Sequence, residues 1–122
     1  MSIATLLTPT MSSEELYATA DFCLIPMGTN ESSVAEYIAE CARVLKKSGL
    51  AHTMHGYGTN IEGPWLAVSQ AIHDCHKAVH AKGAPRVATD IRIGTRTDTK
   101  LDEGHSNDNK LKRVQDILAK DK

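Results

Sequence analysis

The chain has 122 residues, which fits one domain with a single core. Its hydrophobic content of 41% and charged content of 24% are ordinary for a globular protein. The net charge of −1 lacks the basic excess of a nucleic-acid-binding protein. No apolar run approaches the ~20 residues that span a bilayer. We therefore expect neither nucleic acid nor a membrane as a partner.

The cysteines and the first residues bear on the compartment. The chain has three cysteines, Cys23, Cys41 and Cys75. Their odd number, wide spacing and apolar neighbours favour reduced thiols in the core over a disulfide. Residues 1–16 contain no Arg or Lys, whereas secretory and mitochondrial signals are basic. We predict a cytoplasmic protein, with a soluble organelle destination left open. Residues 1–17 are predicted as a flexible N-terminal extension, with a short helical turn at Ser13–Tyr17.

The first strand is predicted at residues 18–26. Its alternation places Ala20, Phe22 and Leu24 on one face. The opposite face carries Asp21, Cys23 and Ile25 and is half apolar, so a sheet with helices on one side would leave it open to a partner.

The remaining elements are predicted in order from periodicity and from helix-end signals. A helix opens with the capping box Ser33-x-x-Glu36 and ends at Gly49. A strand at 51–57, a hairpin at 58–60 and a very short strand around Ile61-Glu62 follow. The rest comprises a helix that starts at Pro64 and closes at Lys82-Gly83, a strand from Arg86 to Gly94, a polar loop at 98–109 and a helix at 110–120.

The order β-α-β-β-α-β predicts an α+β, ferredoxin-like fold. Both long helices would cover one face of a four-stranded antiparallel sheet, with the C-terminal helix added. We expect a ferredoxin-like ligand-binding domain at residues 18–97, followed by a polar loop and C-terminal helix at 98–122.

Three histidines on the second long helix raise the possibility of a metal site. His73, His76 and His80 lie at i, i+3 and i+7, and neutral imidazoles ligate zinc. Three ligands from one straight helix converge poorly on a tetrahedral ion, however, and Cys75 points into the apolar stripe. A solvated or interface face is the favoured interpretation, and no metal is predicted.

Signals of catalysis are weak. Cys23 and Cys75 are expected to be buried, and no hydroxyl sits in a Gly-x-Ser-x-Gly elbow. Phosphate-loop and dinucleotide fingerprints are missing from the sequence. We therefore predict no catalytic residues, no cofactor and no enzymatic activity.

The stretch from Gly56 to Trp65 concentrates three glycines, a hydroxyl, a carboxylate and an indole. In a structural interpretation, Glu62 caps the amides of the following helix and Trp65 plugs the edge of the core. In a functional one, Glu62 accepts hydrogen bonds from a cationic or amine-bearing ligand beside an aromatic face. Thr29, Asn30 and His55 would line the same pocket if the strand ends meet.

Three motifs resemble the thiamine-binding protein family. They are Ile25-Pro26-Met27-Gly28-Thr29, Gly58-Thr59-x-Ile61-Glu62-Gly63 and the run from Arg86-Val87 through Asp90-Ile91-Arg92-Ile93-Gly94-Thr95-Arg96. Each is short, but together they are fairly specific, and the match covers about residues 18–97.

The resemblance implies a ferredoxin-like fold, homodimers or dimer-of-dimers tetramers, and reversible binding of thiamine or a related hydroxymethylpyrimidine without catalysis. Better-characterised members carry two such domains in tandem, so a complete pocket here can require two copies. Thr29, Thr59 and Glu62 lie in these motifs and, together with Asn30, His55 and Trp65 from the pocket argument above, are the predicted ligand-binding residues. The Glu62 carboxylate can accept a hydrogen bond from the aminopyrimidine of thiamine, and Tyr57 or Trp65 can stack on the face of one of its rings.

The open sheet face is the predicted assembly surface. Cys23, Ile25 and Ala88 lie there among charged residues of both signs: Asp21, Asp90, Arg86 and Arg92. The favoured function is a non-catalytic, homo-oligomeric binding protein for thiamine or a related pyrimidine. The alternatives are an interaction oligomer without a small-molecule ligand and, as the weakest, a metal-dependent enzyme using His73, His76 and His80.

Overall fold

The computed structural model describes residues 15–121, which form four strands and three helices. The elements in chain order are β1 (Tyr17–Met27), α2 (Ala35–Ser48), β2 (Ala51–His55), β3 (Gly58–Pro64), α3 (Trp65–Lys82), β4 (Arg86–Gly94) and α4 (Ser106–Leu118).

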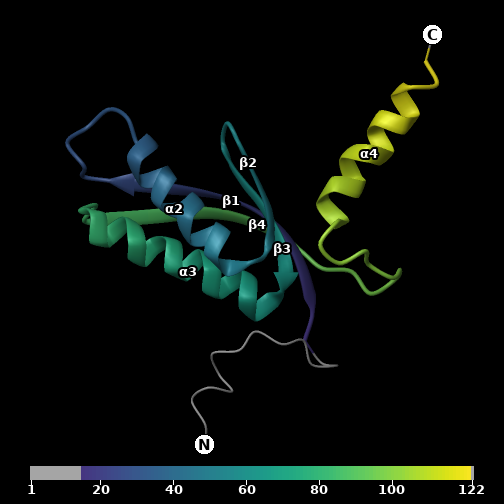
Figure 1. Cartoon of the computed structure of the whole chain (residues 1–122), viewed down its shortest axis with the longest axis horizontal. Helices are drawn as coiled ribbons and strands as arrows, with labels where there is room; N and C mark the ends of the chain where they lie inside the picture. The colour runs from purple at the N-terminus through teal and green to yellow at the C-terminus, as the bar shows by residue number, and fades with distance from the viewer. Residues whose placement is uncertain (1–14, 122) are drawn as a thin grey trace, which may run out of the picture.

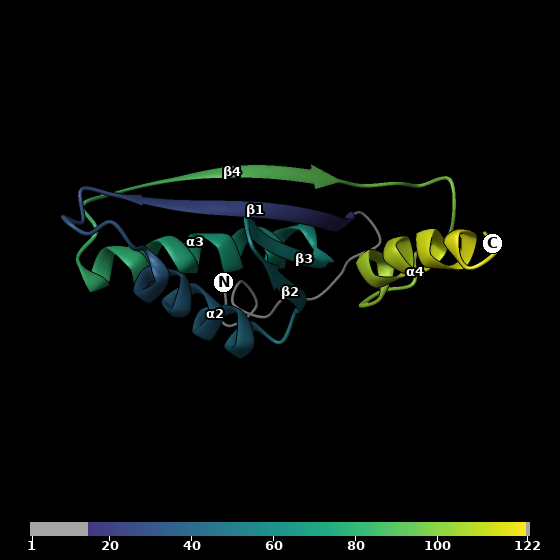
Figure 2. The same ribbon diagram turned by 90° about the horizontal axis from the view of Figure 1, so that it is seen from above.

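The strands form one antiparallel sheet in the order β2-β3-β1-β4. α2 and α3 lie together on one face of this sheet, as the two views show (Figures 1 and 2). α4 covers neither face of the sheet centre and projects beyond the strand ends (Figure 2). The ferredoxin-like α+β fold is confirmed. Within residues 15–121, no helix has the length and apolar character needed to cross a membrane.

The core lies between the sheet and the two long helices. β1 alternates as predicted, because Ala18, Ala20, Phe22 and Leu24 are buried while the side chains between them are partly exposed. From the helices, the buried residues that face this strand include Leu45, Val68, Cys75 and Val79. Within residues 15–121, no helix lies over the centre of the opposite sheet face, where the Ile25 side chain is half-exposed.

The β2–β3 hairpin differs from the prediction. The chain turns at Gly56-Tyr57, so β3 is seven residues long and Thr59 and Asn60 are strand residues. Gly58 lies in β3, where a Cβ would clash with the Phe22 carbonyl oxygen. This glycine therefore permits a close approach of strands and does not form the turn.

Two helix starts also differ. The predicted capping box does not form: α2 begins at Ala35, whose amide donates to the Ser33 hydroxyl, and Glu36 pairs with Lys82 at 3.7 Å. α4 begins at Ser106 and not at residue 110, and the site described below gives the reason. The helical turn predicted at Ser13–Tyr17 is wrong for its described part, because residues 15–16 are not helical and Tyr17 opens β1; residues 13–14 lie outside the described residues.

All three cysteines are free thiols. Cys41 and Cys75 are buried between α2 and α3, where the Cys75 thiol donates to the Cys41 carbonyl at 3.8 Å. Cys23 was expected to be buried but is half-exposed, because its strand position faces away from the helices.

Candidate functional site

Glu62 is a buried carboxylate with three hydrogen-bond donors. Glu62 is only 3% exposed. Oε2 accepts from the Tyr17 hydroxyl at 2.8 Å and from the Ser106 amide at 3.0 Å, while Oε1 accepts from the Asn107 amide at 2.9 Å. A buried carboxylate is tolerated only when it is paired or hydrogen-bonded, and this one is well satisfied.

The two amides belong to the first turn of α4. A helix start leaves amide groups without intrahelical partners and carries a partial positive charge, so a carboxylate there is stabilising. In the structural interpretation of the sequence, Glu62 was expected to cap the helix that follows it, which is α3. Glu62 pairs with Thr19 across the sheet and so faces away from α3, and the Leu66 amide in the first turn of α3 bonds to Glu15 instead.

Tyr17 extends this contact to the loop before α4. Its hydroxyl donates to Glu62 and accepts from the Gly104 amide at 2.6 Å. Burial raises the pKa of Tyr17 above its ordinary value, and the bond to Glu62 raises it further, whereas the Gly104 amide acts in the opposite direction. The hydroxyl therefore keeps its proton at neutral pH and remains a donor.

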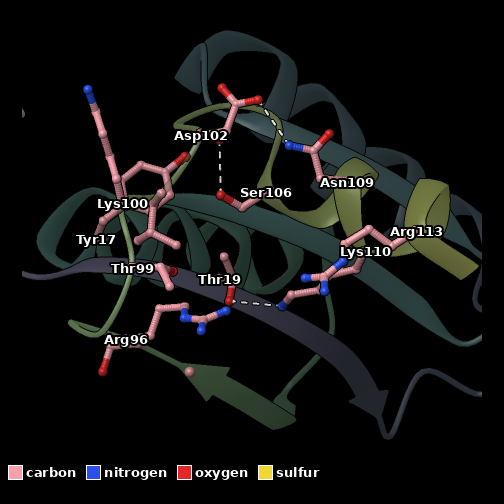
Figure 3. Close-up of a pocket in the computed structure, with 13 residues that line it drawn as sticks. Tyr17, Thr19, Arg96, Thr99, Lys100, Asp102, Ser106, Asn109, Lys110 and Arg113 are labelled. Atoms are coloured by element: carbon pink, nitrogen blue, oxygen red, sulfur yellow. Dashed lines mark hydrogen bonds between the residues drawn. The ribbon is translucent and has the colours of Figure 1, made fainter.

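A cavity of about 440 Å³ lies beside this contact, between the end of the sheet and α4. We call it the α4 cavity, and Figure 3 shows its lining. The residues that line it come from β1, from the end of β4, from the following loop and from α4: Tyr17, Thr19, Gly94, Thr95, Arg96, Thr99, Lys100, Leu101, Asp102, Ser106, Asn109, Lys110 and Arg113.

A smaller pocket of about 140 Å³ lies on the other side of Glu62. It is lined by residues of β2, β3 and the start of α4: Ala51, His52, Thr53, Asn60, Glu62, Gly104, Asn107 and Asp108. Ligand sites for drug-sized molecules usually measure about 300–1,000 Å³. Only the α4 cavity of these two falls in that range.

Cationic side chains dominate the α4 cavity. In Figure 3 the head groups of Arg96, Lys110 and Arg113 point toward Thr19, and the Lys110 ammonium donates to the Thr19 hydroxyl at 3.3 Å. Arg96 also forms a bidentate pair with Asp98 at 2.7 and 2.8 Å, which lowers the pKa of that carboxyl to about 2.

Two of the predicted ligand-binding residues lie at the far end of β1. Thr29 follows Thr19 by ten positions, which corresponds to about 33 Å along an extended chain. Asn30 lies beside it in a left-handed conformation with φ of 61°. The strand ends therefore do not meet, and one chain does not bring Thr29 and Asn30 to Glu62.

The other three predicted residues are also apart from the α4 cavity. His55 bonds to Asp21 at 2.6 Å at the hairpin end of β2. Thr59 is buried on the helix-facing side of the sheet, opposite Phe22. Trp65 begins α3 and is 39% exposed. Glu62 is thus the only one of the six that contacts the start of α4.

The lining residues from the C-terminal segment were not among the predicted site residues. Ser106, Asn109, Lys110 and Arg113 recur at i, i+3, i+4 and i+7, so they share one face of α4. This polar helical period is visible in the sequence. Its position beside β1 is not, because that depends on contacts such as Gly104 to Tyr17, 87 residues apart.

The three histidines of α3 bond elsewhere. His76 Nε2 lies 2.5 Å from the Thr89 hydroxyl, His80 Nδ1 lies 2.8 Å from the Ala84 carbonyl, and His73 lies 3.1 Å from Asp74. Among residues 15–121, no three His, Cys, Asp or Glu side chains gather in a way that would hold a metal ion. The metal-enzyme alternative has no geometric support in this part of the chain.

Replacing Glu62 tests whether its carboxylate caps the start of α4. Glu62→Gln keeps the shape and one accepting oxygen but places an NH₂ group against amide donors. Bonds to a charged acceptor contribute about 1.5–3 kcal/mol each, so we expect local stability at the start of α4 to fall by about that amount. Hydrogen exchange at the Ser106 and Asn107 amides measures the change. The matched control is Glu31→Gln in an exposed loop. Unchanged exchange in Glu62→Gln would contradict the cap.

His76 predicts a pH dependence of stability. Burial lowers the pKa of His76 below its ordinary value of 6.5, and electrostatic repulsion from His80 and His73 lowers it further. The unfolded chain therefore binds this proton more readily, so stability falls as the pH drops below about 6.5. His76→Gln should lose less stability than the wild type between about pH 7.5 and 5.5. Denaturant unfolding checks this, with exposed His105→Gln as the control; equal losses would refute it.

Comparison with known proteins identifies relatives of the whole domain. The family described as "Thiamine-binding protein" matches residues 20–115. A UPF0045 protein of Synechocystis sp. is 50% identical over 98 residues, covering 80% of this chain and 77% of the relative. A UPF0045 protein of Eremothecium gossypii is 40% identical over 84 residues, covering 69% and 80%.

Solved structures share the fold. A hypothetical protein of Methanocaldococcus jannascii aligns with a TM-score of 0.70 and 26% identity, over 81% of this chain and 96% of that one. A Thermotoga maritima protein, named as a candidate for thiamine biosynthesis or salvage, aligns with a TM-score of 0.65 and 12% identity, over 80% and 98%. The second likeness concerns the fold alone. On the match over residues 20–115 and the relatives above, this chain belongs to the thiamine-binding protein family.

Proposed function

We propose that this protein binds thiamine or a related hydroxymethylpyrimidine reversibly in the α4 cavity, without catalysis and as a homo-oligomer. The observation that carries the proposal is a ligand-sized cavity of about 440 Å³ whose helical wall is fixed by Glu62. Membership of the thiamine-binding protein family supports the ligand class.

The cavity offers groups suited to an aminopyrimidine. Tyr17 and Leu101 supply apolar surface, while Thr19, Thr99 and Asn109 carry groups that donate and accept hydrogen bonds. An apolar wall with a few polar groups is the usual make-up of a small-molecule site. The Ser106 hydroxyl donates to the Asp102 carbonyl and not to a base, which supports binding over nucleophilic catalysis.

Glu62 acts in this proposal as a positioning residue. A carboxylate has about four accepting positions, and three of them are occupied by Tyr17, Ser106 and Asn107. Direct recognition of a ligand amine by Glu62 would use its remaining position, on the side of the smaller pocket. A site that joins Glu62 to Thr29, Asn30, His55, Thr59 and Trp65 would require residues from more than one copy of the chain.

An exposed apolar stripe on α4 supports assembly. Four large apolar residues there are 55–63% exposed: Leu111, Val114, Ile117 and Leu118. An amphipathic helix normally buries such a stripe, and Figure 1 shows α4 standing away from the rest of the fold. The open sheet face, with half-exposed Ile25, is the second candidate surface. The same stripe favours the alternative function, an interaction oligomer without a ligand.

Calorimetry with thiamine tests the proposed function. We expect a saturable heat with the wild type and at least about tenfold weaker binding with Asn109→Phe, because the larger side chain fills the α4 cavity. Gln115→Phe places the same side chain on α4 outside the cavity lining and is the matched control. Absence of heat at millimolar thiamine with folded protein would exclude thiamine as the ligand.

Charging the apolar stripe tests assembly. The double variant Val114→Lys, Ile117→Lys should shift the molar mass in solution toward the monomer, because an assembled interface cannot easily bury two unpaired ammonium groups. Light scattering coupled to size exclusion measures the mass. Gln115→Lys adds charge beside the stripe and should leave the mass unchanged. An unchanged mass in the double variant would remove α4 from the interface.

A further inference from the structure

We infer that the α4 cavity recognises a phosphate group, so that the preferred ligand is a phosphate ester of the thiamine or pyrimidine compound. This inference rests on the proposed function and adds the chemical class of the ligand.

The cations that support it come from two separate segments. Arg96 lies in the loop after β4, whereas Lys110 and Arg113 lie one turn apart on α4. Their head groups nevertheless point toward one hydroxyl, that of Thr19 (Figure 3). Arg96 is already paired with Asp98, but Lys110 and Arg113 form no ion pair within residues 15–121, so an anion bound between them would relieve their mutual repulsion.

Local charge sets the α4 cavity apart from the rest of the chain. The whole sequence has a net charge of −1, yet the cavity lining contains four cations and one carboxylate: Arg96, Lys100, Lys110, Arg113 and Asp102. The Asp102 carboxylate accepts from the side-chain amide of Asn109 at 3.0 Å. Within residues 15–121, Arg96 forms an ion pair with Asp98, but Lys100, Lys110 and Arg113 form none. The Lys100 side chain extends away from Thr19 (Figure 3), so Lys110 and Arg113 are the two cations beside Thr19 that remain available to a ligand.

A phosphate ester fits these groups chemically. Arginine presents a planar fork that binds two phosphate oxygens, lysine adds a mobile point charge, and the Thr19 hydroxyl can donate to a third oxygen. An unphosphorylated thiazolium is itself a cation and would be repelled by this lining. A phosphate group reverses the sign of that interaction, while Tyr17 and Leu101 remain available to the ring.

The test compares thiamine, thiamine monophosphate and inorganic phosphate by calorimetry at two salt concentrations. We expect the monophosphate to bind at least about tenfold more tightly than thiamine, and we expect this preference to shrink as the salt concentration rises. In the double variant Lys110→Gln, Arg113→Gln that preference should be lost while thiamine still binds. The matched control, Lys112→Gln with Lys120→Gln, removes two charges from the same C-terminal segment outside the cavity lining.

The contrary outcomes are distinct. Equal binding of thiamine and its monophosphate to the wild type overturns the inference but leaves the proposed function standing. A preference that persists in the double variant also overturns it, because the phosphate would then be recognised elsewhere. If inorganic phosphate binds as tightly as the ester, the cavity is a site for free anions, and the inference of a phosphate ester is overturned. If neither thiamine compound binds, both the inference and the proposed function fail.

Discussion

The buried contact between Glu62 and the start of α4 determines how the C-terminal segment is placed. Burying a carboxylate is costly, and here the cost is offset by three donors and by the positive end of a helix. Tyr17 adds a bond to the Gly104 amide, so both the loop and the helix are held at the end of β1. Without this contact, the α4 cavity would lose one of its walls.

The fold was predictable from local patterns because those patterns report burial. Alternation in β1 and β4 and the apolar periods of α2 and α3 identify faces that must meet, and few topologies satisfy them. Gly49 ends α2 in the left-handed conformation with φ of 74°, as its position predicts. Gly58 was misinterpreted because its role depends on the Phe22 carbonyl of a strand far away in sequence.

The site was less predictable because residues that are adjacent in a motif point to opposite faces of a strand. Thr59 and Glu62 belong to one motif, but Thr59 faces the helices and Glu62 faces the open side. Conversely, Tyr17 and Ser106 meet at Glu62 although no sequence pattern joins them. The capping role of Glu62 was predictable in kind. The helix that it caps was not predictable, since α4 begins at Ser106, four residues before the predicted start at residue 110.

α4 connects the proposed ligand to the proposed assembly. It contributes Asn109, Lys110 and Arg113 to the α4 cavity, while Val114 and Ile117, four and seven positions after Lys110, lie next to these cations on the helix and are exposed. A ligand that bridges α4 and β1 would hold the helix in one orientation and thus present its apolar stripe in one direction. By thermodynamic linkage, a partner that binds only that orientation must in turn tighten ligand binding. Glu62 then influences both equilibria, because it fixes the helix end from which both sets of residues extend.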